Sequence, residues 1–122
     1  MERVRGIGGI FFKAKDPKAL ARWYAEHLGV PVEEWGGGRF VWREHDPRGD
    51  ASTVWSTFRA DSDYYPGAFM VNFRVDDLDA MLAQLRAAGV RVDDKVDDSE
   101  YGRFGWAHDP EGNKIELWQP PA

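Results

Sequence analysis

Apolar residues recur at helical spacing in two stretches of the chain, and both stretches carry the same start and stop signals. The first runs from Asp16-Pro17 to Gly29, and the second from Asp76-Asp77 to Gly89. An aspartate caps the first turn of a helix, proline is favoured at its first position, and glycine ends its last turn. The sequence therefore predicts two amphipathic helices, with the apolar faces Leu20, Trp23, Tyr24 and Leu28 in the first and Leu78, Met81, Leu82 and Leu85 in the second.

Alternating apolar and polar side chains predict β-strands around these helices. In the last strand, which follows an Asp-Pro-x-Gly-Asn turn, Ile115 and Leu117 point to one face and Glu116 and Trp118 to the other. The acidic stretch 93–101 is expected to be a loop. The expected strands are residues 10–15, 30–35, 39–44, 52–58, 70–75, 90–92, 103–107 and 115–118.

The second half of the chain repeats the first at an offset of 60 to 63 residues. Asp16 matches Asp77, the Gly-Val pair at 29–30 matches that at 89–90, and the His-Asp-Pro-x-Gly turn at 45–49 matches that at 108–112. Each half reads β-α-β-β-β. The predicted fold class is α+β, with two βαβββ modules forming a curved mixed sheet and the helices on its outer face. Residues 1–122 are expected to form a single domain, with module one at 1–59, a linker at 60–67 and module two at 68–122.

Composition and charge exclude several classes of protein. The net charge of −5 comes without a basic stripe, which argues against a nucleic-acid partner. The longest apolar runs are far shorter than the roughly 18 residues of a membrane span, and the beginning of the chain lacks the apolar core of a signal peptide. Cysteine is absent, which excludes disulfides and thiolate chemistry and fits a cytoplasmic location. The aromatic content of 14%, with 6 Trp, favours a surface that binds small molecules.

Two motifs resemble the vicinal oxygen chelate superfamily, which groups glyoxalase I, bleomycin-resistance proteins and extradiol dioxygenases. One is Phe12-x-x-x-Asp16-Pro17, leading into a helix with Trp23-Tyr24 and Leu28-Gly29. The other is Asp109-Pro110-x-Gly112-Asn113-x-Ile115-Glu116-Leu117 at the end of the chain. The resemblance covers essentially the whole chain. It implies paired βαβββ modules, a homodimer in chains this short, and ligands held in the concave face of the sheet.

Metal-using members of this superfamily place side-chain ligands on the first and last strand of each module. Transferred by register, those positions are Gly9, Thr53, Met70 and Glu116. Glycine has no side chain, a Met thioether is soft and neutral, and Thr is a weak neutral ligand, whereas a divalent ion needs several His or carboxylate ligands. We therefore expect no metal or other cofactor. Glyoxalase and dioxygenase chemistry, which uses the metal, is put in doubt.

The inward positions of the predicted sheet supply the candidate ligand-binding residues. Aromatic walls with a few polar groups are typical of a small-molecule pocket, and Lys13 and Arg74 are two cations that can contact an anionic ligand. Which face of the strands with Phe40-Trp42 and Phe104-Trp106 points inward stays open. The candidate set is Phe11, Lys13, Thr53, Trp55, Met70, Asn72, Arg74, Glu116 and Trp118.

Two functions remain open from the sequence. The first is a metal-free small-molecule-binding protein of the glyoxalase/bleomycin-resistance type, with an aromatic-lined cleft in a homodimer. The alternative is an enzyme, either a metal-dependent lyase, isomerase or dioxygenase using Glu116, or a metal-free one with Glu116 as general base. We interpret His27, His45 and His108 as helix, turn or surface residues rather than ligands. Whether the protein is an enzyme stays undecided.

Overall fold

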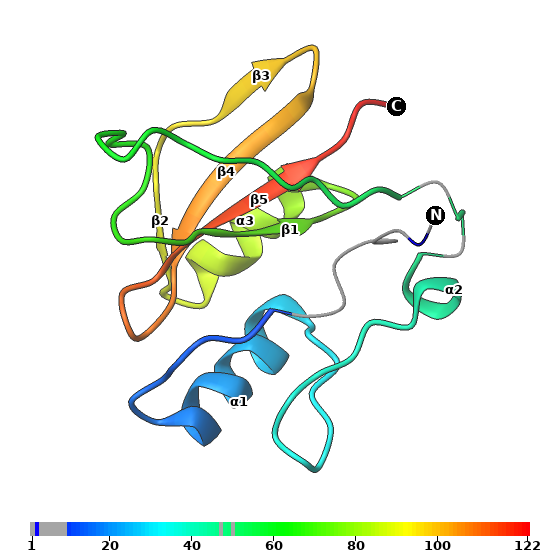
Figure 1. The fold of residues 1–122 in the computed structure, drawn as a ribbon, viewed down its shortest axis with the longest axis vertical. Helices are drawn as coiled ribbons and strands as arrows, with labels where there is room; N and C mark the ends of the chain where they lie inside the picture. The colour runs from blue at the N-terminus through cyan, green and yellow to red at the C-terminus, as the bar shows by residue number, and fades with distance from the viewer. Residues whose placement is uncertain (1, 3–9, 47, 50) are drawn as a thin grey trace.

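The computed structural model describes residue 2 and residues 10–46, 48–49 and 51–122. It is a mixed α+β structure with an open, mixed, five-stranded sheet, which confirms the predicted fold class (Figure 1). The elements, in chain order, are α1 Pro17–Leu28, α2 Trp42–His45, β1 Val71–Arg74, α3 Leu78–Ala87, β2 Arg91–Val92, β3 Asp97–Ser99, β4 Gly102–His108 and β5 Lys114–Gln119.

Both long helices begin and end at the signals that the sequence predicts. The Asp16 carboxylate accepts a hydrogen bond from the Ala19 backbone N–H at 3.1 Å, and Asp77 accepts one from Ala80 at 3.0 Å. These bonds satisfy amides that have no partner within the first turn of a helix. Gly29 adopts the left-handed conformation with φ of 68°, which ends α1.

The sheet has the strand order β1-β5-β4-β2, and β3 pairs with the other end of β4. β1 runs parallel to β5, and every other pair is antiparallel. The turn between β4 and β5 is organised by Asp109, whose carboxylate accepts hydrogen bonds from the backbone N–H groups of Glu111 and Asn113, each at 2.9 Å. The two longest strands therefore form a hairpin around the motif at the end of the chain.

Helix α3 covers one face of the sheet, behind β4 and β5 in Figure 1. The outer face of β4 carries small residues, and a Cβ at Gly105 would lie 3.1 Å from Leu82 of α3. The helix therefore lies close to the strand. The hydrophobic core joins this interface to helix α1, and its buried residues are Leu20, Tyr24, Leu78, Leu82, Leu85, Ala107, Ile115 and Leu117.

Helix α1 joins the second half of the chain through Tyr24. Its ring packs against Phe73 of β1 with centroids 5.9 Å apart, and its hydroxyl donates to Asp109 Oδ2 at 2.8 Å. Near the start of α1, the Glu111 carboxylate accepts hydrogen bonds from the backbone N–H groups of Lys15 and Asp16. The turn before β5 thus ties the two halves together.

The described residues of the first half contain helices but no strand, which differs from the sequence-based expectation. Segments 10–15, 30–35 and 52–58 lack regular strand pairing apart from a single bridge between Val32 and Gly38, and segment 39–44 runs into helix α2. A strand needs a neighbour for its backbone groups, whereas in α2 the N–H groups of Glu44 and His45 bond the Val41 carbonyl locally. The expected loop at 93–101 is also wrong in part, since it contains β3.

Large apolar side chains of the first half lie at the surface of the described structure. Phe11 is 92% exposed, Trp55 77% and Trp42 75%. Such rings are candidates for contact with another molecule. Within the described residues, no helix is long and apolar enough to cross a membrane.

Candidate functional site

The face of the sheet opposite α3 carries side chains from three adjacent strands in register. Asn72 of β1 pairs with Glu116 of β5, which pairs in turn with Trp106 of β4. The next row toward the end of β5 contains Arg74, Trp118 and Phe104. Side chains on one face of paired strands lie close together, so this face holds a carboxylate between aromatic and amide groups.

Glu116 is only 8% exposed, and its carboxylate accepts three hydrogen bonds from neutral donors. Tyr64 Oη and Trp106 Nε1 donate to Oε2 at 2.6 and 3.0 Å, and Asn72 Nδ2 donates to Oε1 at 2.8 Å. A buried carboxylate is costly unless it is hydrogen-bonded, and bonds to an ionised acceptor are the strong ones. These three donors therefore hold the carboxylate in a fixed orientation at the centre of the face.

Tyr64 comes from the segment that crosses in front of the sheet in Figure 1. Its ring meets the Trp106 ring edge to face at 5.8 Å and stacks on Phe58 at 5.2 Å. Burial and the adjacent Glu116 carboxylate raise the pKa of the Tyr64 hydroxyl well above its ordinary value. The hydroxyl therefore stays protonated and donates to Glu116 across the physiological range.

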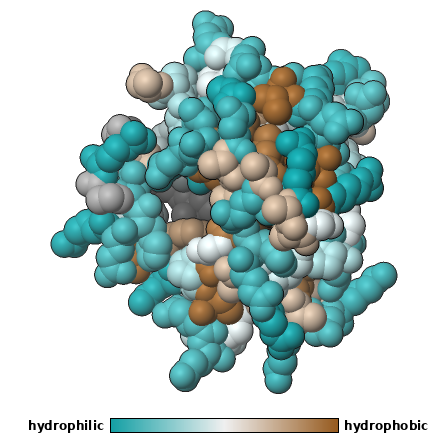
Figure 2. Space-filling view, turned by 180° about the vertical axis from the view of Figure 1, so that it is seen from behind, coloured by the Kyte–Doolittle hydropathy of each residue, from teal (hydrophilic) through white to brown (hydrophobic). Residues whose placement is uncertain are grey.

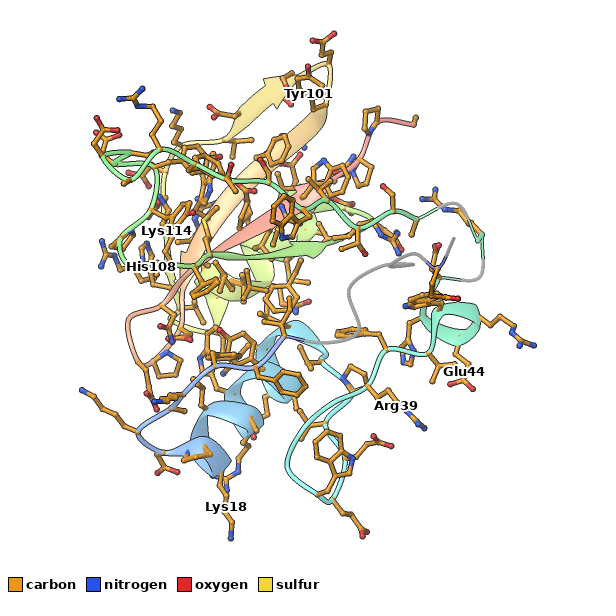
Figure 3. The ribbon with its side chains drawn as sticks, viewed as in Figure 1. Lys18, Arg39, Glu44, Tyr101, His108 and Lys114 are labelled. Atoms are coloured by element: carbon orange, nitrogen blue, oxygen red, sulfur yellow. The ribbon has the colours of Figure 1, made fainter. Side chains whose placement is uncertain are left out.

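A charged group borders the ring pair at the start of β5. Lys114 Nζ donates to the Tyr64 carbonyl at 3.0 Å and lies 5.4 Å from the centroid of the Trp106 ring. It also pairs with Asp93 Oδ2 at 3.7 Å, and His108 Nε2 lies 2.9 Å from Asp93 Oδ1. Figure 3 shows Lys114 and His108 next to each other at the same end of the sheet. A lysine, an aspartate and a histidine thus bound the site on this side.

Aromatic and basic residues continue toward the other end of the sheet. Trp118 stacks on Phe104 with an interplanar angle of 9° and centroids 6.2 Å apart, and its Nε1 donates to the Tyr101 carbonyl at 2.9 Å. In Figure 3, Tyr101 lies far from Lys114 and His108. Arg74 pairs with Asp46 at 3.4 Å, so this cation already has a carboxylate partner.

A hollow lies on the helix side of β1. It is a cleft of about 350 Å³ between the end of α1, α2, β1 and α3, and its walls include Phe40, His45, Arg74 and Met81. Figure 2 shows the molecule hollowed on the face seen from behind. This cleft is not the concave sheet face that the sequence predicted as the pocket.

The structure brings together the candidate residues of the second half and not those of the first. Asn72, Glu116 and Trp118 share one face of the sheet, Arg74 follows in register on the edge strand β1 but also lines the cleft on the helix side, and Met70 precedes β1 half-buried. Phe11, Lys13, Thr53 and Trp55 are exposed in segments without strand structure. These side chains were predicted to point inward because their segments were expected to be strands, and the described chain forms no strand there.

Sequence reasoning missed Tyr64 and left Trp106 undecided. The small residues on either side of Trp106 could have indicated its direction. Gly105 and Ala107 fit under α3, so the Trp106 side chain lies on the opposite face of β4. Tyr64 lies in a turn-rich segment with no periodic pattern, so no sequence rule places its hydroxyl. Of the histidines, His27 contacts Trp23, His45 accepts from the Val41 N–H, and His108 lies against Asp93.

The donor set at the positions that the resemblance assigns to a metal does not fit a divalent ion. Gly9 lies outside the described residues, Thr53 is exposed, and Met70 offers only a neutral thioether. In Glu116, the carboxylate oxygens already accept bonds from Tyr64, Asn72 and Trp106. Among the described residues, no three His, Cys, Asp or Glu side chains gather where they could hold a metal ion.

Comparison with known proteins identifies the fold. The family model of the glyoxalase-like domain matches residues 9–118. No curated protein matches the chain.

Solved structures of similar architecture include TnmS3, an antibiotic binding protein from Streptomyces sp. CB03234, at 24% identity, a TM-score of 0.55 and 88% coverage of both chains. TioX from Micromonospora sp. ML1 has 20% identity and a TM-score of 0.54, covering 88% of this chain and 93% of its own. A glyoxylase/bleomycin resistance protein/dioxygenase domain from Frankia sp. EAN1pec has 15% identity and a TM-score of 0.60, covering 98% and 94%. At these identities the likeness concerns the fold alone. The match to the family model confirms the resemblance seen in the sequence.

Proposed function

Because the chain belongs to the glyoxalase-like domain family, we propose that it binds a planar, amphipathic small molecule on the sheet face around Glu116, without a metal ion. The observation that carries this proposal is the Glu116 carboxylate, fixed by three neutral donors between aromatic rings. Small-molecule sites combine such apolar walls with a few fixed polar groups. One fold relative supports the choice, since TnmS3 is named an antibiotic binding protein.

The charges of this face favour a ligand without strong net charge. Lys114 is paired with Asp93, and Arg74 with Asp46. An anionic ligand would compete with these carboxylates and approach Glu116, which is itself an anion. The half-buried aromatic rings of Phe104 and Trp118 instead offer stacking and edge contacts to an uncharged planar ligand.

We also propose that the binding protein is a homodimer. In one chain, Phe11 and Trp55 are 92% and 77% exposed, and β1 has no second neighbouring strand among the described residues. A second copy covering these groups would bury apolar rings and satisfy the outer edge of β1. Sedimentation equilibrium of wild type and Trp55→Glu tests this, because the charge is expected to shift the protein toward monomer. A wild-type protein that stays monomeric at 100 µM excludes the dimer.

Ligand titration followed by tryptophan fluorescence tests the proposed function. Planar aromatic compounds are expected to quench the emission of wild type, and Glu116→Gln, which preserves the shape of the side chain, is expected to change their affinity. Trp35→Phe is a matched control, because Trp35 is 70% exposed and donates to Glu33 away from the sheet. If no planar compound perturbs the emission, the proposal fails.

Elemental analysis of protein purified without chelators tests the metal-dependent alternative. We expect no stoichiometric divalent metal. Stoichiometric zinc, nickel, manganese or iron that is lost in Glu116→Ala would replace the binding proposal by a metal-dependent enzyme.

A further inference from the structure

Tyr64 sits on the site in the manner of a bound aromatic molecule. Its hydroxyl donates to Glu116 Oε2 at 2.6 Å, and its ring lies edge to face with Trp106 at 5.8 Å. Lys114 Nζ lies 5.8 Å from the centre of the Tyr64 ring. One phenol side chain therefore makes the polar contact, the aromatic contact and the cation contact that this face offers.

The segment that carries Tyr64 is held to the sheet by few groups. Residues 59–63 are exposed, and the ion pair between Arg59 and Asp61 lies in solvent, with side chains 86% and 73% exposed. The polar bonds between Tyr64 and the sheet are its hydroxyl bond to Glu116 and its carbonyl bond from Lys114. A segment with so few buried contacts opens at small cost in free energy.

Displacement of Tyr64 leaves a vacancy with a definite chemical preference. Glu116 Oε2 then has one free acceptor position, while Trp106 still donates to it at 3.0 Å. An incoming carboxylate would be repelled by the Glu116 carboxylate at close range. An incoming ammonium would meet Lys114, which lies 5.4 Å from the Trp106 ring. A neutral hydroxyl donor on an aromatic ring avoids both repulsions.

We infer that Tyr64 occupies the place of the ligand, and that the site takes an uncharged hydroxylated aromatic compound whose hydroxyl donates to Glu116 and whose ring lies against Trp106. Entry of this compound displaces Tyr64 from the sheet. The inference rests on the proposed function, which requires only that some planar molecule binds this face. It adds the chemical class of the ligand and the residue that competes with it.

Calorimetric titration with a matched set of naphthalene compounds tests the inference. 2-Naphthol carries the hydroxyl, 2-methoxynaphthalene lacks the donor, and 2-naphthoate carries a negative charge. Wild type is compared with Tyr64→Ala and Tyr64→Phe, and Tyr65→Phe is the control because Tyr65 contacts Phe58 and Tyr64 rather than Glu116.

Removal of the competing hydroxyl is expected to tighten 2-naphthol binding about tenfold in Tyr64→Ala, since a hydrogen bond to a charged acceptor no longer has to be broken. 2-Methoxynaphthalene also has to displace Tyr64 and is expected to gain as much, but it is expected to bind about tenfold more weakly than 2-naphthol throughout, because it donates no hydrogen bond to Glu116. Tyr65→Phe is expected to bind both compounds as wild type does. Should Tyr64→Ala fold poorly, Tyr64→Phe keeps the ring and removes only the donor, and it is expected to tighten both compounds while the preference for naphthol over its methyl ether stays.

The outcomes separate this inference from the proposed function. Equal affinities of 2-naphthol and 2-methoxynaphthalene, no gain for either compound in Tyr64→Ala, or tightest binding of 2-naphthoate would overturn the inference and leave the aromatic site standing. If none of the three compounds binds wild type or any Tyr64 variant, the proposed function falls together with the inference.

Discussion

The hydroxyl of Tyr24 offers a sharp test of how the two halves of the chain are joined. It donates at 2.8 Å to Asp109 Oδ2, and both residues are buried, at 7% and 5% exposed. Tyr24→Phe removes only this hydroxyl and keeps the ring contact with Phe73. A hydrogen bond to a charged acceptor contributes about 1.5–3 kcal/mol, and Asp109 Oδ2 keeps a second bond from Asn113. We expect the variant to lose about 2 kcal/mol in its free energy of unfolding at neutral pH.

Alkaline pH gives this prediction a second signature. Burial, with the hydrogen bond and the charge of Asp109, raises the pKa of Tyr24 far above its ordinary value of 10. Above pH 10, the unfolded chain releases this proton and the folded chain keeps it, so the folded state loses stability as the pH rises. Between pH 9 and 11 the advantage of wild type over Tyr24→Phe is expected to shrink by about 1.4 kcal/mol.

Urea unfolding followed by circular dichroism, at pH 7, 9, 10 and 11, measures both effects. Tyr101→Phe is the control, because Tyr101 is 69% exposed and its loss is expected to change neither the stability nor its pH dependence. Parallel pH curves for wild type and Tyr24→Phe would refute the reasoning, since they would mean that this hydroxyl titrates alike in the folded and unfolded chains.

Two further changes test the turns at the ends of β4 and β5. Gly102 has φ of 116°, and an added Cβ would collide with a backbone carbonyl of β5, whereas Gly36, with φ of 100°, has open space around it. In urea unfolding, the free energy of unfolding is therefore expected to fall by about 2 kcal/mol more in Gly102→Ala than in Gly36→Ala. Both variants force alanine into a positive φ, but only Gly102→Ala adds the collision. Glu111→Ala removes the acceptor of the Lys15 and Asp16 N–H groups, and the same assay is expected to record a loss of about 1–2 kcal/mol.

Local signals in the sequence predicted the helices and the second-half strands. Asp16 and Asp77 cap helices because a capping carboxylate acts on amides three residues away, a relation that the sequence contains. Alternation at 10–15 and 52–58 predicted strands equally well by pattern, yet the described chain forms none there. Alternation predicts which way side chains point if a segment is paired in a sheet. Whether the segment is paired depends on strands far away in the sequence, which the segment itself does not determine.

Part of the candidate site could be predicted from the sequence, namely the residues on strands that the structure contains. Glu116, Asn72 and Trp118 follow from alternation on strands that do form. The contact of Tyr64 with Glu116 spans 52 residues and comes from a segment without periodicity, so it depends on the tertiary path of the chain. Alternation placed Glu116 on the face of β5 opposite Ile115 and Leu117, whereas its contact with Tyr64 became visible only in three dimensions.

The hydrogen bonds of Glu116 restrict what can replace Tyr64. Trp106 is 3% exposed, and its Nε1 depends on Oε2 as an acceptor, so a group that takes this oxygen completely would leave a buried donor unsatisfied at a cost of about 1–3 kcal/mol. A hydroxyl ligand replaces only the bond from Tyr64, because a carboxylate oxygen accepts two hydrogen bonds. A cation bound through Oε2 would compete with Trp106 and Tyr64 together. Exchange of one hydroxyl for another therefore keeps every buried polar partner of this carboxylate satisfied.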